Sequence, residues 1–226
     1  IFINTERVVS TFQHRRRHAF YSFSSGRLLL LLLVVSFLVA CVASQPNNIT
    51  NVCSIFEDRR GWYSAAKSAE DRWGIPIAVN MAFIYQESSF IARAKPDRTR
   101  VLWVIPGSRP SSAYGYAQAL DGTWDDYRVA SRNRGASRSD FDDSIDFVAW
   151  YNGNSRRISN ISTFDARNLY FAYHEGNGGY QRGTHHDKPS ILDAADRVQT
   201  NSERFAIQLN SCRRNLEKNW FQRLLS

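Results

Sequence analysis

Residues 76–90 read PIAVNMAFIYQESSF, which is the most apolar helical pattern in the chain. Pro76 suits the first turn of a helix, because proline lacks the amide proton that this turn leaves unpaired. The residues after it are apolar nearly all round, so we expect them to form the buried central helix of the protein. Glu87 stands at the C-terminal end of this helix, where a carboxyl group can leave the core. The stretch therefore predicts a helical core with one acidic group at its edge.

Helical spacing of apolar residues continues on both sides of this stretch. Residues 62–73 carry apolar side chains three and four positions apart, and Gly74 is expected to end that helix. Further helical patterns cover residues 123–132, 141–151, 164–174 and 189–212, whereas strand-like alternation is nearly absent. Between Ala94 and Ser112 the chain is rich in Pro, Gly and Arg, which predicts a long loop. The sequence thus predicts a single all-α domain at residues 53–212, followed by a basic tail at 213–226.

The N-terminal residues have the parts of a signal peptide. Arginines precede an uncharged run from Leu28 to Ala40, which is too short for a comfortable membrane span and ends in a small residue. Cleavage after residue 40 would leave Cys41 as the first residue. Ile1 stands first and Met81 is the only methionine, so we expect the translation start to lie elsewhere.

The residues around this cleavage point, Leu38-Val39-Ala40-Cys41, resemble the bacterial lipobox. The resemblance implies a lipid on Cys41, whose acyl chains would anchor the protein to a membrane surface. Val42 in place of Asp implies an outer-membrane lipoprotein that faces the periplasm, and the polar residues 41–52 are expected to form the lipidated tether. An ordinary cleaved signal with an accidental cysteine is the alternative.

The net charge bears on the kind of binding partner, and the cysteines bear on whether the protein contains a disulfide. The net charge is +8, but residues 1–40 hold five of the 29 Lys and Arg residues and one of the 21 acidic residues, which leaves +4. This mild balance suits a polyanion or plain solubility, and no nucleic-acid recognition motif is present. An exported protein meets an oxidising compartment, so a disulfide between Cys53 and Cys212 is a hypothesis, with two free buried thiols as the alternative.

Three short motifs carry a more specific resemblance. They are Glu87-Ser88-Ser89-Phe90, Ala113-Tyr114-Gly115-Tyr116-Ala117-Gln118 and Ala172-Tyr173-His174-Glu175-Gly176-Asn177-Gly178. In this order they resemble the three motifs of the soluble lytic transglycosylase (SLT) family. The resemblance implies a lysozyme-like fold, Glu87 as the catalytic residue, Gly115 and Gln118 as a cleft segment, and Tyr173 as the tyrosine of the third motif. His174 and Glu175 depart from the Asn and Ala that the family usually has.

The residues themselves agree with this chemistry. Burial at a helix end would raise the pKa of Glu87, and a carboxylic acid that stays protonated near neutral pH can protonate a glycosidic oxygen. For substrate binding we expect backbone approach at Gly115, hydrogen bonds from Gln118 and a stacking face on Tyr116. Ser88 and Tyr173 complete the predicted substrate-binding set. Taken singly, each residue also has a structural interpretation: a solvated charge, a turn or a core aromatic.

The resemblance implies a peptidoglycan lytic transglycosylase. Such an enzyme cleaves the bond between N-acetylmuramic acid and N-acetylglucosamine, leaves a 1,6-anhydromuramoyl end and needs no cofactor. Two alternatives stay open: a hydrolytic lysozyme with Asp121, Asp125 or Glu175 as second carboxylate, and a non-catalytic lipoprotein that binds peptidoglycan. His185-His186 beside Asp187 lacks a third ligand at helical spacing, so we expect a solvated loop and no metal there.

Overall fold

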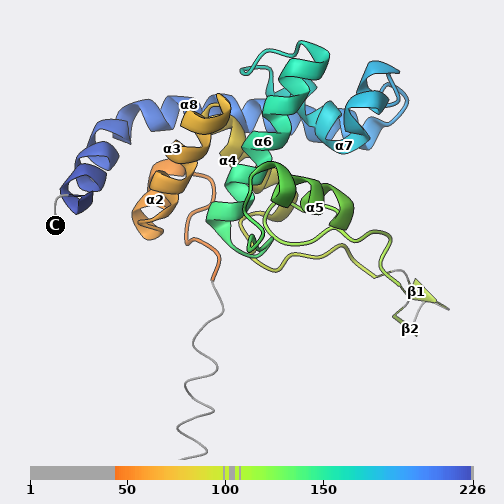
Figure 1. The fold of residues 1–226 in the computed structure, drawn as a ribbon, viewed down its shortest axis with the longest axis horizontal. Coiled ribbons are helices and arrows are strands. Elements are labelled where there is room, and N and C mark those ends of the chain that lie inside the picture. Colours follow the sequence, from red (N-terminus) through yellow and green to blue (C-terminus); the bar gives the residue numbers. More distant parts are fainter. Residues whose placement is uncertain (1–43, 99, 102–104, 107, 225–226) are drawn as a thin grey trace, which may run out of the picture. The chain divides into compact units, whose positions relative to one another are not determined.

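The structure is a computed structural model that describes residues 44–98, 100–101, 105–106 and 108–224. The predicted all-α fold is confirmed (Figure 1). The strands in the described residues are two short ones of two residues each, which pair antiparallel inside the expected loop. Within the described part of the chain, no helix is both long and apolar enough to cross a membrane. The elements are α2 (Val52–Asp58), α3 (Trp62–Trp73), α4 (Ile77–Ser88), β1 (Arg100–Val101), β2 (Ile105–Pro106), α5 (Asp121–Ala130), α6 (Phe141–Ser159), α7 (Ala166–Gln181) and α8 (Pro189–Leu224).

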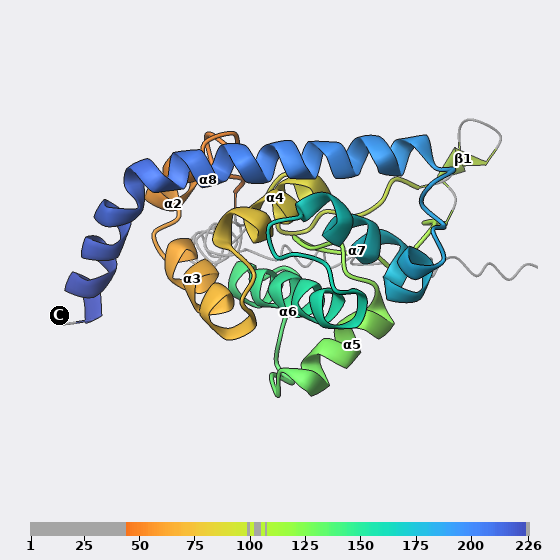
Figure 2. The same ribbon diagram turned by 90° about the horizontal axis from the view of Figure 1, so that it is seen from above.

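Helix α4 is the buried centre of the domain, as its sequence predicts. Met81, Ala82 and Phe83 are fully buried, and the helix packs against α8, α6 and α3. Figure 2 shows α8 running along the domain, with α4 and α7 beside it. The helix ends where Ser89 adopts a left-handed conformation with φ of 51° and its amide bonds back to the carbonyl of Tyr85. This ending places Glu87 in the last turn.

The C-terminal part of α8 corrects a predicted boundary. Residues 213–224 do not form a separate tail, because α8 continues without interruption to Leu224. The hydroxyl of Tyr63 in α3 donates to Glu217 at 3.2 Å, and Leu216 is buried. The helix continues past residue 212 because these side chains pack it against the domain.

The segment before α2 also differs from the prediction of a free tether. Arg59 donates to the carbonyl of Ser44 at 2.7 Å, and Gln45 donates to the carbonyl of Ser89 at 2.6 Å. The chain is therefore bound to the domain from Ser44 onward. The proposed signal peptide at 1–40 and the lipidated Cys41 lie outside the described residues, so they stay predictions.

A disulfide joins the first helix to the last. Cys53 in α2 is bonded to Cys212 in α8, with the two Cα atoms 6.1 Å apart and a sequence separation of 159. The structure thus contains the bond that the two cysteines suggested. It closes almost the whole domain into one covalent loop, which limits the freedom of the unfolded chain.

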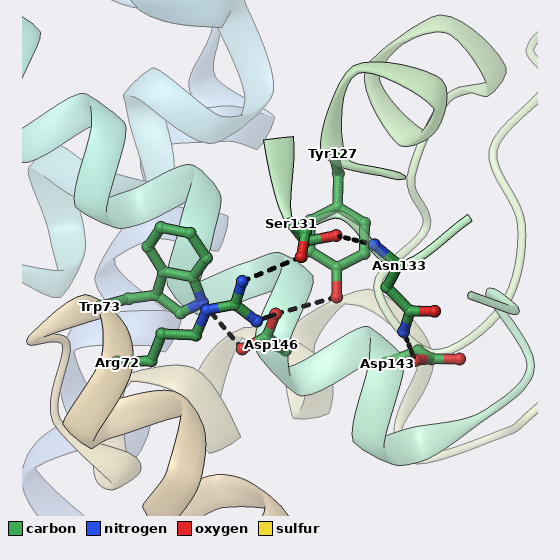
Figure 3. A network of polar contacts seen from close by, with 7 residues as sticks. All are labelled: Arg72, Trp73, Tyr127, Ser131, Asn133, Asp143 and Asp146. Carbon is green, nitrogen blue, oxygen red and sulfur yellow. Dashed lines mark hydrogen bonds and ion pairs between the residues drawn. The ribbon is translucent and has the colours of Figure 1, made fainter. Parts of the chain in front are cut away.

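A polar network fixes α3, α5 and α6 against one another (Figure 3). Asp146 of α6 accepts hydrogen bonds from the indole of Trp73 at 2.7 Å and from the hydroxyl of Tyr127 at 2.9 Å. Arg72 donates to the same carboxylate at 3.3 Å and to the carbonyl of Ser131 at 3.0 Å. One partly buried carboxylate therefore accepts hydrogen bonds from donors on both neighbouring helices.

Candidate active site

The carboxyl group of Glu87 is the best candidate for chemistry in the described residues. It stands in the last turn of the most buried helix. Burial raises the pKa of Glu87 to about 7, and a hydrogen bond from the hydroxyl of Tyr170 opposes that rise. A group with this pKa exists in both protonation states near neutral pH, which is what a group that acts as acid and then as base needs.

Tyr173 connects the three motifs in space. Its ring packs edge-on against Phe83 of α4 at 5.3 Å and against Tyr151 of α6 at 5.0 Å. Its hydroxyl donates a hydrogen bond of 2.6 Å to the carbonyl of Ala117 in the second motif. Burial, and then the charge of Glu87, raise the pKa of Tyr173 well above its ordinary value. Tyr173 therefore lies near the carboxyl of Glu87 and stays a neutral donor.

The second motif forms a tight turn that the side-chain amide of Gln118 stabilises. Gln118 has a positive φ of 47°, and its side-chain nitrogen donates to the carbonyls of Ala94 at 3.0 Å and Gly115 at 2.8 Å. Both amide protons are thus directed to the protein. The oxygen of this side chain is the part that remains for a donor on a ligand.

Gly115 is required for a different contact from the one predicted. A Cβ atom at this position would lie 1.8 Å from the carbonyl oxygen of Arg138, and φ is +79°. The next amide, that of Tyr116, donates to the same oxygen at 3.1 Å. The close approach that glycine permits in this structure is therefore to the backbone of Arg138, and approach of a sugar to this backbone stays a prediction.

Two further members of the predicted substrate-binding set are occupied within the protein. Tyr116 is 2% exposed and packs edge-on against Trp62 and Phe141, so the prediction that it offers a stacking face is wrong. The side chain of Ser88 is buried and its hydroxyl donates to the carbonyl of Ile84 at 3.1 Å. We leave both out of the proposed substrate contacts.

Arg138 is a residue of the site region that the sequence did not reveal. Its guanidinium donates to the carbonyls of Ser112 at 3.0 Å and Ala119 at 2.8 Å, on either side of the second motif. It also pairs with Asp121 at 2.7 Å. Arg138 thus holds the turn from both ends. No motif marks it, since its partners are distant in the sequence.

Tyr170 is the second residue that sequence reasoning missed. It lies in α7 and its hydroxyl bonds to the carboxyl of Glu87. The spacing in the sequence could have indicated Tyr170, because it precedes Tyr173 by three positions and residues three apart on a helix share a face. Two tyrosines on one face of α7 therefore point to the end of α4.

Glu175 is one of the two residues at which the third motif departs from the family. Its carboxylate forms an ion pair with Lys188. Lys188 contacts both carboxylate oxygens at 2.9 and 2.7 Å, and Thr184 and His174 also bond to this side chain. Burial would raise the pKa of Glu175, but these hydrogen bonds outweigh it and lower the pKa to about 2. The contacts tie α7 to the start of α8.

Comparison with known proteins identifies the family. A family model described as "Transglycosylase SLT domain" matches residues 29–212, and the chain therefore belongs to this family. No curated protein and no solved structure matches the chain. The all-α domain is thus the lysozyme-like fold of the SLT family, whose enzymes are lytic transglycosylases, and the substrate that the family implies is peptidoglycan.

Proposed function

We propose that the protein is a lytic transglycosylase that cleaves the β-1,4 bond between N-acetylmuramic acid and N-acetylglucosamine, with Glu87 as acid and base. The observation that carries the proposal is the raised pKa of the Glu87 carboxyl group. Burial at the end of α4 raises its pKa to about 7, so the same group can give a proton and then take one near neutral pH.

In the first step, Glu87 gives its proton to the glycosidic oxygen as the bond from this oxygen to C1 of the muramic acid breaks. The N-acetyl group of that sugar stabilises the positive charge that develops at C1. The Glu87 carboxylate then takes the proton from the C6 hydroxyl, and the C6 oxygen bonds to C1. The product is a 1,6-anhydromuramoyl end, and Glu87 is protonated again without the use of water or a cofactor.

The contacts of other acidic residues favour this route over hydrolysis. A hydrolase of the usual kind needs a second carboxylate across the scissile bond. Asp121 pairs with Arg138, Asp125 pairs with Arg128 at 3.2 Å, and Glu175 is held by its bonds to α8. Within the described residues, no second carboxylate contributes to the pKa of Glu87.

Product analysis tests the reaction and the residue together. The chain from Val42 onward, its Glu87→Gln variant and the control Glu57→Gln are incubated with peptidoglycan sacculi, and soluble products are analysed by mass spectrometry. Glu57 is an exposed glutamate of α2. We expect anhydromuropeptides from the wild type and the control and none from Glu87→Gln. Reducing-end muropeptides would make the protein a lysozyme, and binding without products would make it a non-catalytic wall-binding protein.

We also propose that the protein acts in the bacterial cell envelope as an outer-membrane lipoprotein facing the periplasm, through a lipid on Cys41. The lipobox resemblance at Leu38 to Cys41 supports this location. Cells that express the chain are labelled with a palmitate analogue. Label on the wild type that is lost in Cys41→Ala is expected, whereas an unlabelled wild-type protein in the soluble periplasmic fraction would exclude the anchor.

A further inference from the structure

Side chains from three helices meet behind the carboxyl of Glu87. Arg197 of α8 donates to the side-chain oxygen of Gln86 at 3.4 Å. The hydroxyl of Tyr170, from α7, bonds to both Gln86 and Glu87. The Tyr170 ring is 5% exposed and packs edge-on against Phe83 at 5.6 Å, so the ring has little freedom to move. The bonds form a chain from Arg197 through Gln86 and Tyr170 to Glu87.

The direction of each bond in this chain follows from the groups available. The hydrogen bond with Gln86 lowers the pKa of Tyr170, which means that it favours the phenolate, so the amide nitrogen of Gln86 donates to the Tyr170 oxygen while the amide oxygen accepts from Arg197. A phenol has one proton. Because the oxygen of Tyr170 accepts from Gln86, its proton is directed to Glu87.

We propose that Tyr170 is a positioning residue for Glu87 and that Gln86 and Arg197 orient its hydroxyl. The role rests on the proposed function of Glu87. A hydrogen bond to one carboxyl oxygen fixes the rotation of the group and leaves the other oxygen to carry the proton to the substrate. After that transfer, the same donor stabilises the carboxylate that must act as base.

The role of Tyr170 can be measured without substrate. The pKa of Glu87 is followed by NMR of its side-chain carboxyl carbon in the wild type and in Tyr170→Phe. Loss of the donor removes a bond that favours the charged form, so the pKa of Glu87 is expected to rise by roughly half a unit to one unit. Tyr180→Phe is the matched control, because Tyr180 lies in the same helix and its hydroxyl bonds to Asn168 at 3.2 Å.

Gln86→Met tests the second bond of the chain and is the variant to use if Tyr170→Phe does not fold. It leaves the phenol in place but removes the group that directs its proton, so a smaller rise in the pKa of Glu87 is expected. In activity assays, the alkaline limb of kcat/KM is expected to move with the pKa in both variants, with KM little changed.

The two readouts separate failure of this inference from failure of the proposed function. An unchanged pKa of Glu87 in both folded variants would overturn the positioning role, even if the wild type makes anhydromuropeptides. A shifted pKa in a protein whose wild type makes no product would support the contact and refute the proposed function. A shift of the same size in Tyr180→Phe would also overturn the role, because the effect would then not depend on contact with Glu87.

Discussion

The hydroxyl of Tyr173 donates a hydrogen bond of 2.6 Å to the carbonyl of Ala117, which joins α7 to the turn of the second motif. Its ring meanwhile packs on Phe83 of the helix that carries Glu87. One side chain thus fixes the distance between the turn and the proposed catalytic group.

Tyr173→Phe is expected to keep the ring packing but leave the carbonyl of Ala117 without this donor. Loss of such a bond costs about 1–1.5 kcal/mol of stability, and the turn becomes free to move relative to Glu87. Denaturant unfolding and the release of muropeptides measure the two effects. Tyr63→Phe loses a bond to Glu217 and should lower stability alone. Equal activity of Tyr173→Phe and wild type would speak against this role.

The raised pKa of Glu87 predicts a dependence of stability on pH. The pKa of Glu87 is about 7 in the folded state against an ordinary value of 4.5 in the unfolded chain, so the unfolded state releases its proton at lower pH. Stability is therefore lost as the pH rises from 4.5 through 7, by about 3 kcal/mol in total. Glu87→Gln cannot ionise and should match wild type at pH 4 but exceed it at pH 8. Unfolding curves with parallel pH dependence in both proteins would contradict the assignment.

Gly115→Ala is expected to destabilise the second motif. The added Cβ would meet the carbonyl of Arg138, a backbone atom that cannot turn aside, and φ is positive. We expect a loss of about 2–4 kcal/mol. Gly122→Ala is the matched control, because nothing lies within 4 Å of its Cβ position in α5. Its stability should stay within about 1 kcal/mol of wild type. A Gly115→Ala protein as stable as this control would show that the turn can shift.

The cysteine pair predicts sensitivity to reduction. Its loop spans 159 positions of sequence, and a loop of this size contributes about 5 kcal/mol in the chain-entropy model. Reductant should therefore lower the urea midpoint of the wild type. The double variant Cys53→Ala/Cys212→Ala should start from the lower midpoint and not respond to reductant. An identical midpoint of wild type with and without reductant would mean that the bond does not form in solution.

Much of the fold follows from apolar periodicity alone. The pattern at 76–90 predicts α4, because a helix that is apolar on all sides must be central. The sequence did not predict α2, which is only seven residues long, or the last turns of α8. Those turns depend on Tyr63 and Glu70 of α3, which contact Glu217 and Arg213 across the whole length of the chain. Contacts of that range leave no local periodicity.

The chemistry of the site could be predicted from the sequence, but the directions in which its side chains point could not. A motif places Glu87 and Tyr173 in sequence, but it does not say which side chain of a turn points inward. Tyr116 faces Trp62 and Phe141, whose positions depend on how α3 and α6 pack. Arg138 and Tyr170 enter the site through tertiary contacts, so only the structure assigns them a place.

Among the carboxylates outside the site, Asp146 is the one whose substitution is expected to lower the stability of the fold most. Asp146→Ala leaves the indole of Trp73 and the hydroxyl of Tyr127 without their acceptor, and Arg72 loses its ion pair. Unpaired donors at a helix interface should cost about 3 kcal/mol. Asp146→Asn keeps one acceptor oxygen and should recover part of this loss.

Asp142→Ala is the matched control, since Asp142 is an exposed acid of the same helix. It removes one acidic group from the first turn of α6, where a helix-dipole gain of about 0.5 kcal/mol is opposed by burial and by repulsion from Asp140 and Asp143, which raise the pKa of Asp142, so little net change in stability is expected. Thermal unfolding at constant pH ranks the three proteins. If Asp146→Ala and Asp142→Ala melt together, the donors find other acceptors and the network of Figure 3 does not hold the three helices in place.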